Sequence, residues 1–190
     1  TAHAAHPKSQ IERRYSKLKN KLKANLLLLG VALLVIAADQ ASKLFIQRQL
    51  AFGQEWLPFT PSDFFRIVNW QHTGAAFGIF QNANTVLKVL TSAIILFILG
   101  YYQTIPYAQK FVRVCLAIML GGAVGNLIDR FRLGYVLDFI GVGRFPVFNL
   151  ADSCVTVGVG MLILALLLED KNSRARHMKE AALEQHPPED

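Results

Sequence analysis

Apolar residues along the chain gather in four long runs that are separated by polar segments. The runs cover about residues 26–46, 86–102, 111–128 and 148–168. Each has roughly the 20 residues that a helix needs to cross about 30 Å of hydrocarbon. Lys88 lies near the start of its run, where a long side chain reaches the interface. The pattern therefore predicts four transmembrane helices.

The composition points to the same class of protein. Of 190 residues, 53% are hydrophobic and only 17% are charged, with a mean hydropathy of +0.32, which is too apolar for a typical soluble domain. Seven of the 20 Lys and Arg residues lie between Lys8 and Lys23, directly before an apolar run, as membrane-flanking segments do. The net charge of +7 therefore indicates no nucleic-acid partner.

Cys115 and Cys154 both lie in apolar runs and have neither the spacing nor the number of a metal or disulfide framework.

The distribution of basic residues predicts an orientation. Lys and Arg concentrate in the tail before Ala24, in the link between the second and third runs, and in the tail after Leu168. Cytoplasmic segments retain the positive charge of membrane proteins. We therefore expect both termini in the cytoplasm and residues 48–83 and 131–147 on the outer side.

The predicted organisation has three parts: a basic tail at 1–23, a four-helix membrane domain at 24–170 and a second tail at 171–190. A different interpretation makes the first apolar run a cleaved secretory signal that ends at Ala38. Three further apolar runs follow in a topology that needs the first one, and the polar residues from Asp39 onwards join a cluster of polar side chains at the outer membrane level. The four-helix organisation is therefore favoured.

Polar side chains from four stretches of the chain reach the same outer level in this topology. They are Asp39 and Lys43, Asn126, Asp129 and Arg130, Asn149 and Asp152, with Asp138 and His72 in the two external segments. Charged groups within a membrane usually face the bundle interior, where they pair or serve a function. The alternative is that they are ordinary helix-end residues at the water boundary, and for Lys43, Arg48 or Arg132 taken singly this explanation fits as well.

The four carboxylates have different surroundings. Asp39 and Lys43 are four residues apart on one helix face, which predicts an ion pair. Asp129 precedes Arg130, and we expect it to be a paired, ionised structural residue. Asp138 lies among apolar and aromatic residues with no adjacent cation, whereas Asp152 falls in the first turn of a helix, where the macrodipole favours a carboxylate.

Two aspartates with unlike environments suit an aspartic peptidase, in which one acts as base on a water and the other as acid. Other peptidase chemistries lack parts: His72 is the only histidine outside the tails, and neither a Gly-x-Ser-x-Gly turn nor a His-Glu-x-x-His motif occurs. Two alternatives stay open at this point. One is a small proton-coupled transporter or channel subunit that relays protons over Asp39, Asp129 and Asp138. The other is a non-catalytic assembly subunit held together by glycine faces.

Glycines predict a close approach of the third and fourth helices. Gly121 and Gly125 form a Gly-x-x-x-Gly pair, and the fourth run offers Gly158 and Gly160. Such packing would draw the polar residues of these two helices together.

Five motifs in this order resemble the lipoprotein signal peptidases, also called signal peptidase II, of bacterial inner membranes. The motifs are DQASK at 39–43, TGAAF at 73–77, GGAVGNLIDR at 121–130, GYVLDF at 134–139 and FNLADS at 148–153. The resemblance implies an endopeptidase that cuts prolipoprotein signal peptides just before a diacylglyceryl-modified cysteine. It also implies an all-α membrane fold in which residues 48–83 supply a small extracytoplasmic β-cradle and a mobile element over the site.

By motif matching, the resemblance makes Asp138 and Asp152 the catalytic pair and implies no cofactor or metal. Supporting or substrate-binding roles would fall to Asp39, Lys43, His72, Gly74, Asn126, Arg130 and Asn149. The implied partners are lipidated prolipoproteins, membrane lipid and cyclic-peptide inhibitors of the globomycin type. One position departs from the family: His72 stands where Asn is typical, and a histidine that titrates near neutral pH would make substrate binding pH-sensitive.

Overall fold

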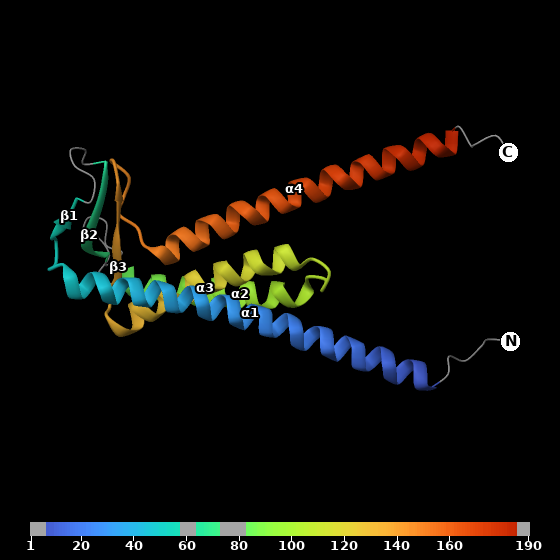
Figure 1. Ribbon diagram of the computed structural model, residues 1–190, viewed down its shortest axis with the longest axis horizontal. Helices are drawn as coiled ribbons and strands as arrows, with labels where there is room; N and C mark the ends of the chain where they lie inside the picture. The colour runs from blue at the N-terminus through green and yellow to red at the C-terminus, as the bar shows by residue number, and fades with distance from the viewer. Residues whose placement is uncertain (1–6, 58–63, 73–82, 186–190) are drawn as a thin grey trace.

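The computed structural model describes residues 7–57, 64–72 and 83–185. These ranges form four helices and three strands, in the order α1 (Pro7–Gln49), β1 (Glu55–Trp56), β2 (Phe65–His72), α2 (Ala83–Thr104), α3 (Lys110–Arg132), β3 (Val136–Val142) and α4 (Leu150–Gln185). All four helices are long and apolar enough to cross a membrane, which confirms the predicted fold class. Figure 1 shows the sheet at one end of the molecule and both termini at the other.

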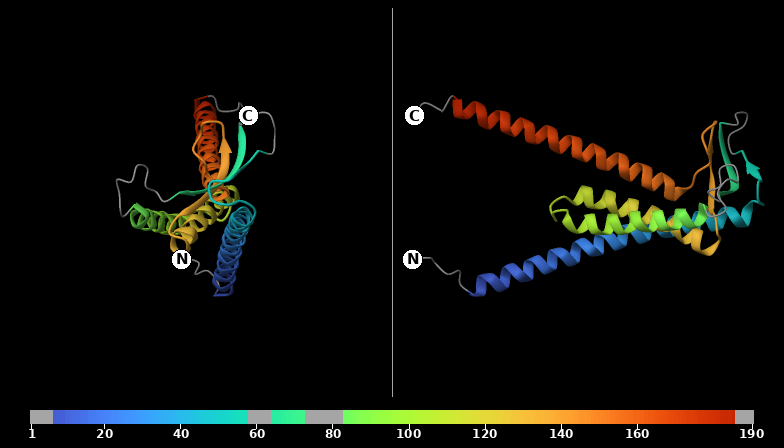
Figure 2. Two further views of the ribbon diagram at one scale, coloured as in Figure 1. Left: turned by 90° about the vertical axis from the view of Figure 1, so that its left-hand side faces the viewer. Right: turned by 180° about the vertical axis from the view of Figure 1, so that it is seen from behind.

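Helices α1 and α4 continue well beyond the apolar runs that predicted them. Both diverge from the bundle toward the termini and extend past the short connection between α2 and α3 (Figures 1 and 2). At about 1.5 Å per residue, the 43 residues of α1 are roughly twice as long as a bilayer core is thick. Parts of α1 and α4 therefore lie outside the membrane.

Helix α3 is the centre of the bundle and packs against α1, α2 and α4. Of its most apolar 18-residue window 56% is buried, against at most 22% in the other three helices. The core around it consists of Leu28 and Ala32 of α1, Ile98 and Tyr102 of α2, and Leu116 and Leu120 of α3. The other helices expose many large apolar side chains, as lipid-facing helices do.

The glycines of α3 serve two neighbouring helices, not one as the sequence suggested. A Cβ at Gly121 would lie 2.7 Å from Val35 Cβ of α1, and one at Gly125 would lie 2.6 Å from the Asp39 carboxylate of the same helix. Gly122 instead faces α4, where its Cβ would lie 2.5 Å from the Ala151 carbonyl. The Gly-x-x-x-Gly pair thus admits α1. Helix α4 approaches α3 over Gly122 and through its own Gly158, whose Cβ would lie 2.5 Å from Met119 Cγ, so the predicted close approach of these two helices is confirmed. At Gly160 no atom lies within 4 Å of the position of a Cβ.

The sheet has the strand order β1-β2-β3 with both pairs antiparallel. As expected, residues 48–83 supply strands of the cradle, namely β1 and β2, and the third strand, β3, comes from the other external segment, residues 131–147. Leu137 and Phe139 of β3 pack against Ile46 near the end of α1. Because side chains alternate along a strand, Asp138 points to the opposite side, where Asn149 at the start of α4 contacts it. The expected mobile element lies mostly outside the described residues.

Candidate active site

Asp152 is fixed by the start of helix α4. Asn149 is the residue before the helix, and its side-chain oxygen accepts a hydrogen bond from the Asp152 backbone N–H at 2.9 Å. In return, the Asp152 carboxylate accepts from the Asn149 backbone N–H at 3.3 Å. This reciprocal arrangement is a capping box, with Asp in the place usually taken by Glu or Gln. It leaves Asp152 half-buried with one carboxylate oxygen free for other partners.

Asn149 also holds the second carboxylate. Its Nδ2 donates to Asp138 Oδ1 at 2.7 Å, and both residues are buried. Burial, followed by the negative charge of Asp152, raises the pKa of Asp138 from 3.8 to about 7. The structure therefore joins the two predicted catalytic residues through a single asparagine and gives them different environments.

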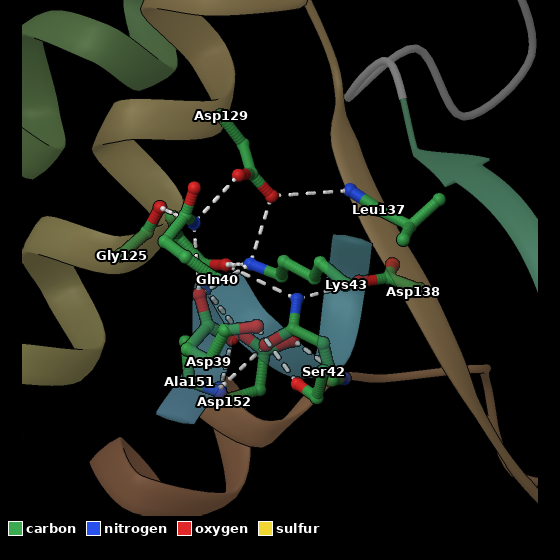
Figure 3. A network of polar contacts seen from close by, with 12 residues as sticks. Asp39, Gln40, Ser42, Lys43, Gly125, Asp129, Leu137, Asp138, Ala151 and Asp152 are labelled. Atoms are coloured by element: carbon green, nitrogen blue, oxygen red, sulfur yellow. Dashed lines mark hydrogen bonds and ion pairs between the residues drawn. The ribbon is translucent and has the colours of Figure 1, made fainter. Parts of the chain in front are cut away.

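A buried ion-pair network lies behind this pair (Figure 3). Lys43 Nζ is 2.8 Å from Asp39 Oδ2 and 2.8 Å from Asp129 Oδ2, and all three side chains are almost fully buried. The predicted Asp39–Lys43 pair is confirmed. Asp129 is paired as expected, but its partner is Lys43 of α1 and not the adjacent Arg130.

Asn126 connects the network to the pair. Its Oδ1 accepts from Lys43 Nζ at 3.0 Å and from Asn149 Nδ2 at 3.1 Å. Its Nδ2 is then directed at Asp152 Oδ1, 2.7 Å away. Because Lys43 and Asn149 both occupy the amide oxygen, the amide nitrogen has a single possible direction. Asn126 therefore orients the carboxylate of Asp152.

Asp39 reaches helix α4 as well as Lys43. Its Oδ1 accepts from the Ala151 backbone N–H at 3.0 Å, which satisfies one of the open donors of the first helical turn. The helix dipole favours a carboxylate there. Asp39 of α1 thus positions the start of the helix that carries Asp152, from 112 residues away in the sequence.

Gln40 belongs to this site, although the sequence analysis gave it no role. Its Nε2 donates to Asp129 Oδ1 at 2.9 Å and lies 3.2 Å from Asp39 Oδ2 and 3.3 Å from the Gly125 carbonyl. The usable signal was its spacing of three residues from Lys43, which makes the two side chains neighbours on the surface of helix α1. Asp129 has a third partner, the Leu137 backbone N–H at 3.4 Å, which ties strand β3 to α3.

Arg130 points away from the ion-pair network. Within the part of the chain that the structure describes it makes no ion pair, and its Nη1 donates to Thr91 Oγ1 of α2 at 3.3 Å. Arg130, Asn126 and Asp152 line one pocket of about 250 Å³ together with Thr91. A second pocket of about 450 Å³ also reaches Asp152, and it is lined by the apolar side chains of Phe145, Phe148 and Val157 together with Ser153 and Thr156.

Among the described residues, the predicted site residue His72 is not brought into the network. His72 ends strand β2, pairs with Val136 of β3, and is exposed. No hydrogen bond between described residues links His72 to either aspartate. Gly74, with the rest of the motif at 73–77, lies outside the described residues. Within those residues, no group of three or more His, Cys, Asp or Glu side chains is placed to hold a metal ion.

The membrane-spanning part of the chain is similar to known proteins. A family model described as signal peptidase II matches residues 31–168. Lipoprotein signal peptidases of Moorella thermoacetica and Bacillus subtilis are 44% and 39% identical, each over 73% of this chain and over 91% and 92% of their own length. A solved structure described as a bacterial membrane enzyme superposes with a TM-score of 0.68 at 32% identity, covering 76% of this chain and 90% of its own. The chain belongs to the signal peptidase II family.

Proposed function

We propose that this protein removes signal peptides from prolipoproteins by aspartic chemistry at Asp138 and Asp152, cutting before a diacylglyceryl-modified cysteine. The observation that carries the proposal is the hydrogen-bonded link between the two carboxylates through Asn149. Family membership supports the substrate class. It also argues against the transporter and assembly-subunit alternatives.

The two carboxylates differ in the way that the reaction requires. Asp138 is buried and its pKa is raised to about 7, so it holds a proton near neutral pH and serves as the acid. Asp152 is only half-buried, is oriented by hydrogen bonds from the Asn126 side chain and the Asn149 backbone N–H, and lines two pockets from which a water molecule can reach it. Asp152 is therefore the base.

In the first step, Asp152 takes a proton from a water molecule, and the water oxygen attacks the scissile carbonyl carbon. Asp138 donates a hydrogen bond to the carbonyl oxygen as its negative charge develops. In the second step, the C–N bond breaks and the leaving amine takes the Asp138 proton. The proton acquired by Asp152 then restores Asp138, directly or through solvent, and the carboxyl product leaves.

The two pockets that Asp152 lines fit an amphipathic substrate. Arg130 lines the smaller pocket, where guanidinium N–H groups beyond the one donated to Thr91 would suit peptide carbonyls next to the scissile bond. The larger pocket, with Phe145, Phe148 and Val157, suits apolar chains such as those of a lipidated cysteine. Cyclic peptides of the globomycin type would occupy the same cleft by competing for these contacts.

The membrane arrangement follows from charge. Basic residues gather at the end of the bundle where both termini lie, and the sheet and the two aspartates lie at the opposite end. With positive charge retained in the cytoplasm, the protein crosses the bacterial inner membrane four times and its active site faces outwards. A translocated prolipoprotein would meet the aspartates at that surface.

Purified protein in detergent tests the proposal with a prolipoprotein prepared with and without the diacylglyceryl group on its cysteine. We expect cleavage of the lipidated form only, with mass spectrometry placing the cut directly before the modified cysteine. Equal cleavage of both forms would contradict the substrate assignment. Absence of cleavage together with ion flux into liposomes would favour a transporter.

A further inference from the structure

The first part of helix α1 lies outside the packed bundle. Every residue from 11 to 23 is exposed, and burial begins at Ala24, which is 8% exposed. At that residue the Tyr102 hydroxyl of α2 donates to the Ala24 carbonyl at 2.5 Å. The signal peptidase II match begins only at residue 31, so this exposed segment has no part in it.

An apolar stripe runs along this segment. Ile11, Tyr15, Leu18 and Leu22 are spaced by four, three and four residues, which places them within roughly 60° of one another around a helix. Their exposed fractions are 68%, 69%, 60% and 61%. Four large apolar side chains in one row on a helix need a partner that the bundle does not supply.

Basic residues flank the stripe on both sides. Residues 11–23 hold six Lys or Arg residues and one acidic residue, Glu12. By helical position, Arg14 and Lys21 border one edge of the stripe, and Lys19 and Lys23 border the other. Asn20 lies on the face opposite Leu18 and Leu22. Long basic side chains beside an apolar row allow the row to enter acyl chains while the charges stay at headgroup level.

We propose that residues 11–23 dock as an interfacial amphipathic helix on anionic phospholipid headgroups of the adjoining membrane surface. The excess of positive charge selects an anionic partner. It also opposes pairing of the stripe with a second copy, since each copy would bring the same six cations. The inference does not depend on the peptidase reaction.

Docking requires α1 to turn where it leaves the bundle. The Tyr102 hydroxyl donates a hydrogen bond to the Ala24 carbonyl. If the helical hydrogen bonds open at this point, this carbonyl therefore still has a donor in place of the backbone N–H that it loses. The transmembrane part is secured beyond that point by Leu28 and Ala32 in the core. Residues 11–23, all of them exposed, are therefore free to reorient without loss of a buried contact.

Spin labels on the full chain test this placement. In a background of Cys115→Ala and Cys154→Ala, nitroxides are attached to Leu18→Cys on the stripe or to Asn20→Cys on the opposite face as a matched control. The protein is reconstituted in phosphatidylcholine vesicles with or without phosphatidylglycerol. Collision of each label with a water-soluble nickel reagent and with membrane-dissolved oxygen reports its depth.

In anionic vesicles we expect the label at residue 18 to lose nickel collisions and gain oxygen collisions, while the label at residue 20 stays aqueous. Each cation at an anionic surface shifts the docked-to-free ratio about fivefold, so Arg14→Gln, Lys19→Gln and Lys21→Gln together lower it on the order of 100-fold. That triple variant, and raised salt, should return residue 18 to water. Equal aqueous exposure of both labels in anionic vesicles would overturn the proposal. The label at residue 18 could also be buried regardless of lipid charge, with a dependence on the protein-to-lipid ratio and with spin–spin broadening. That result would indicate pairing with a second copy and would also overturn the proposal.

Discussion

Asn149 donates a hydrogen bond to Asp138 at 2.7 Å with the same side chain that caps helix α4. One residue thus sets the direction of strand β3's carboxylate and of the helix that carries Asp152. The geometry of the site is coupled to the start of a helix, so local stability and catalysis are joined at Asn149.

Two substitutions of Asn149 separate these roles. Asn149→Ser keeps a good helix cap but is too short to reach Asp138, whereas Asn149→Ala loses both functions. We expect Asn149→Ser to retain the thermal midpoint and lose about 100-fold in kcat, because misplaced carboxylates lose near-attack geometry. Asn149→Ala should in addition lose about 1 kcal/mol of unfolding free energy. Wild-type kcat in the Ser variant would show that the link to Asp138 is dispensable.

The raised pKa of Asp138 predicts the alkaline side of the pH profile. Burial, then the charge of Asp152, brings this pKa to about 7, and the acid must be protonated to act. As pH rises through that value the proton is lost, so kcat should fall, approaching tenfold per pH unit well above it. Measurement of kcat with a lipidated substrate checks this. A profile that stays flat far into the alkaline range would exclude Asp138 as the acid.

Lys43 is predicted to matter chiefly for folding. Lys43→Met leaves Asp39 and Asp129 buried without their cation, which costs about 3–5 kcal/mol in unfolding free energy. Lys110→Met, at an exposed residue, is the control and should change it by less than about 0.5 kcal/mol. Adding Asp129→Asn to Lys43→Met should recover part of the loss. Equal unfolding free energies of Lys43→Met and Lys110→Met would mean that the ion pairs contribute nothing.

Close packing at Gly125 gives a further prediction. A Cβ there would lie 2.6 Å from Asp39 Oδ2, and that carboxylate is held by Lys43 and the Ala151 N–H. Gly125→Ala should therefore lower the unfolding free energy by about 1–3 kcal/mol, the range seen for overpacking. Gly100→Ala, where a Cβ meets no atom within 4 Å, is the matched control and should cost nothing. Equal midpoints for the two variants in detergent would contradict the close approach.

The four spans were predictable because lipid-facing helices need long apolar runs, whatever their partners. The ends of the helices were less predictable. Residues before Ala24 carry no apolar run, so hydropathy could not show that α1 continues through them. Strand β3 was missed for a different reason: a short apolar stretch around Asp138 does not show period-two alternation against the rest of its segment.

The sequence predicted which residues form the site, but not which of them contact one another. The spacing of Asp39 and Lys43 fixed their pairing, since both lie on one helix. Asp129 was expected to pair with its sequence neighbour Arg130, because the sequence does not show which residue of another helix lies next to it. Its actual partner is Lys43 of α1. Likewise the glycines of α3 indicated close packing without saying which neighbour each one faces.

The central claim is that Asp138 and Asp152 perform the reaction. The most direct test is kcat/KM of Asp138→Asn and Asp152→Asn on a lipidated prolipoprotein, with exposed Glu55→Gln as the control and the thermal midpoint of each variant recorded. We expect each aspartate variant to stay folded and lose at least about 100-fold, while the control retains full activity. A folded variant of either aspartate that cleaves at the wild-type rate would contradict the account.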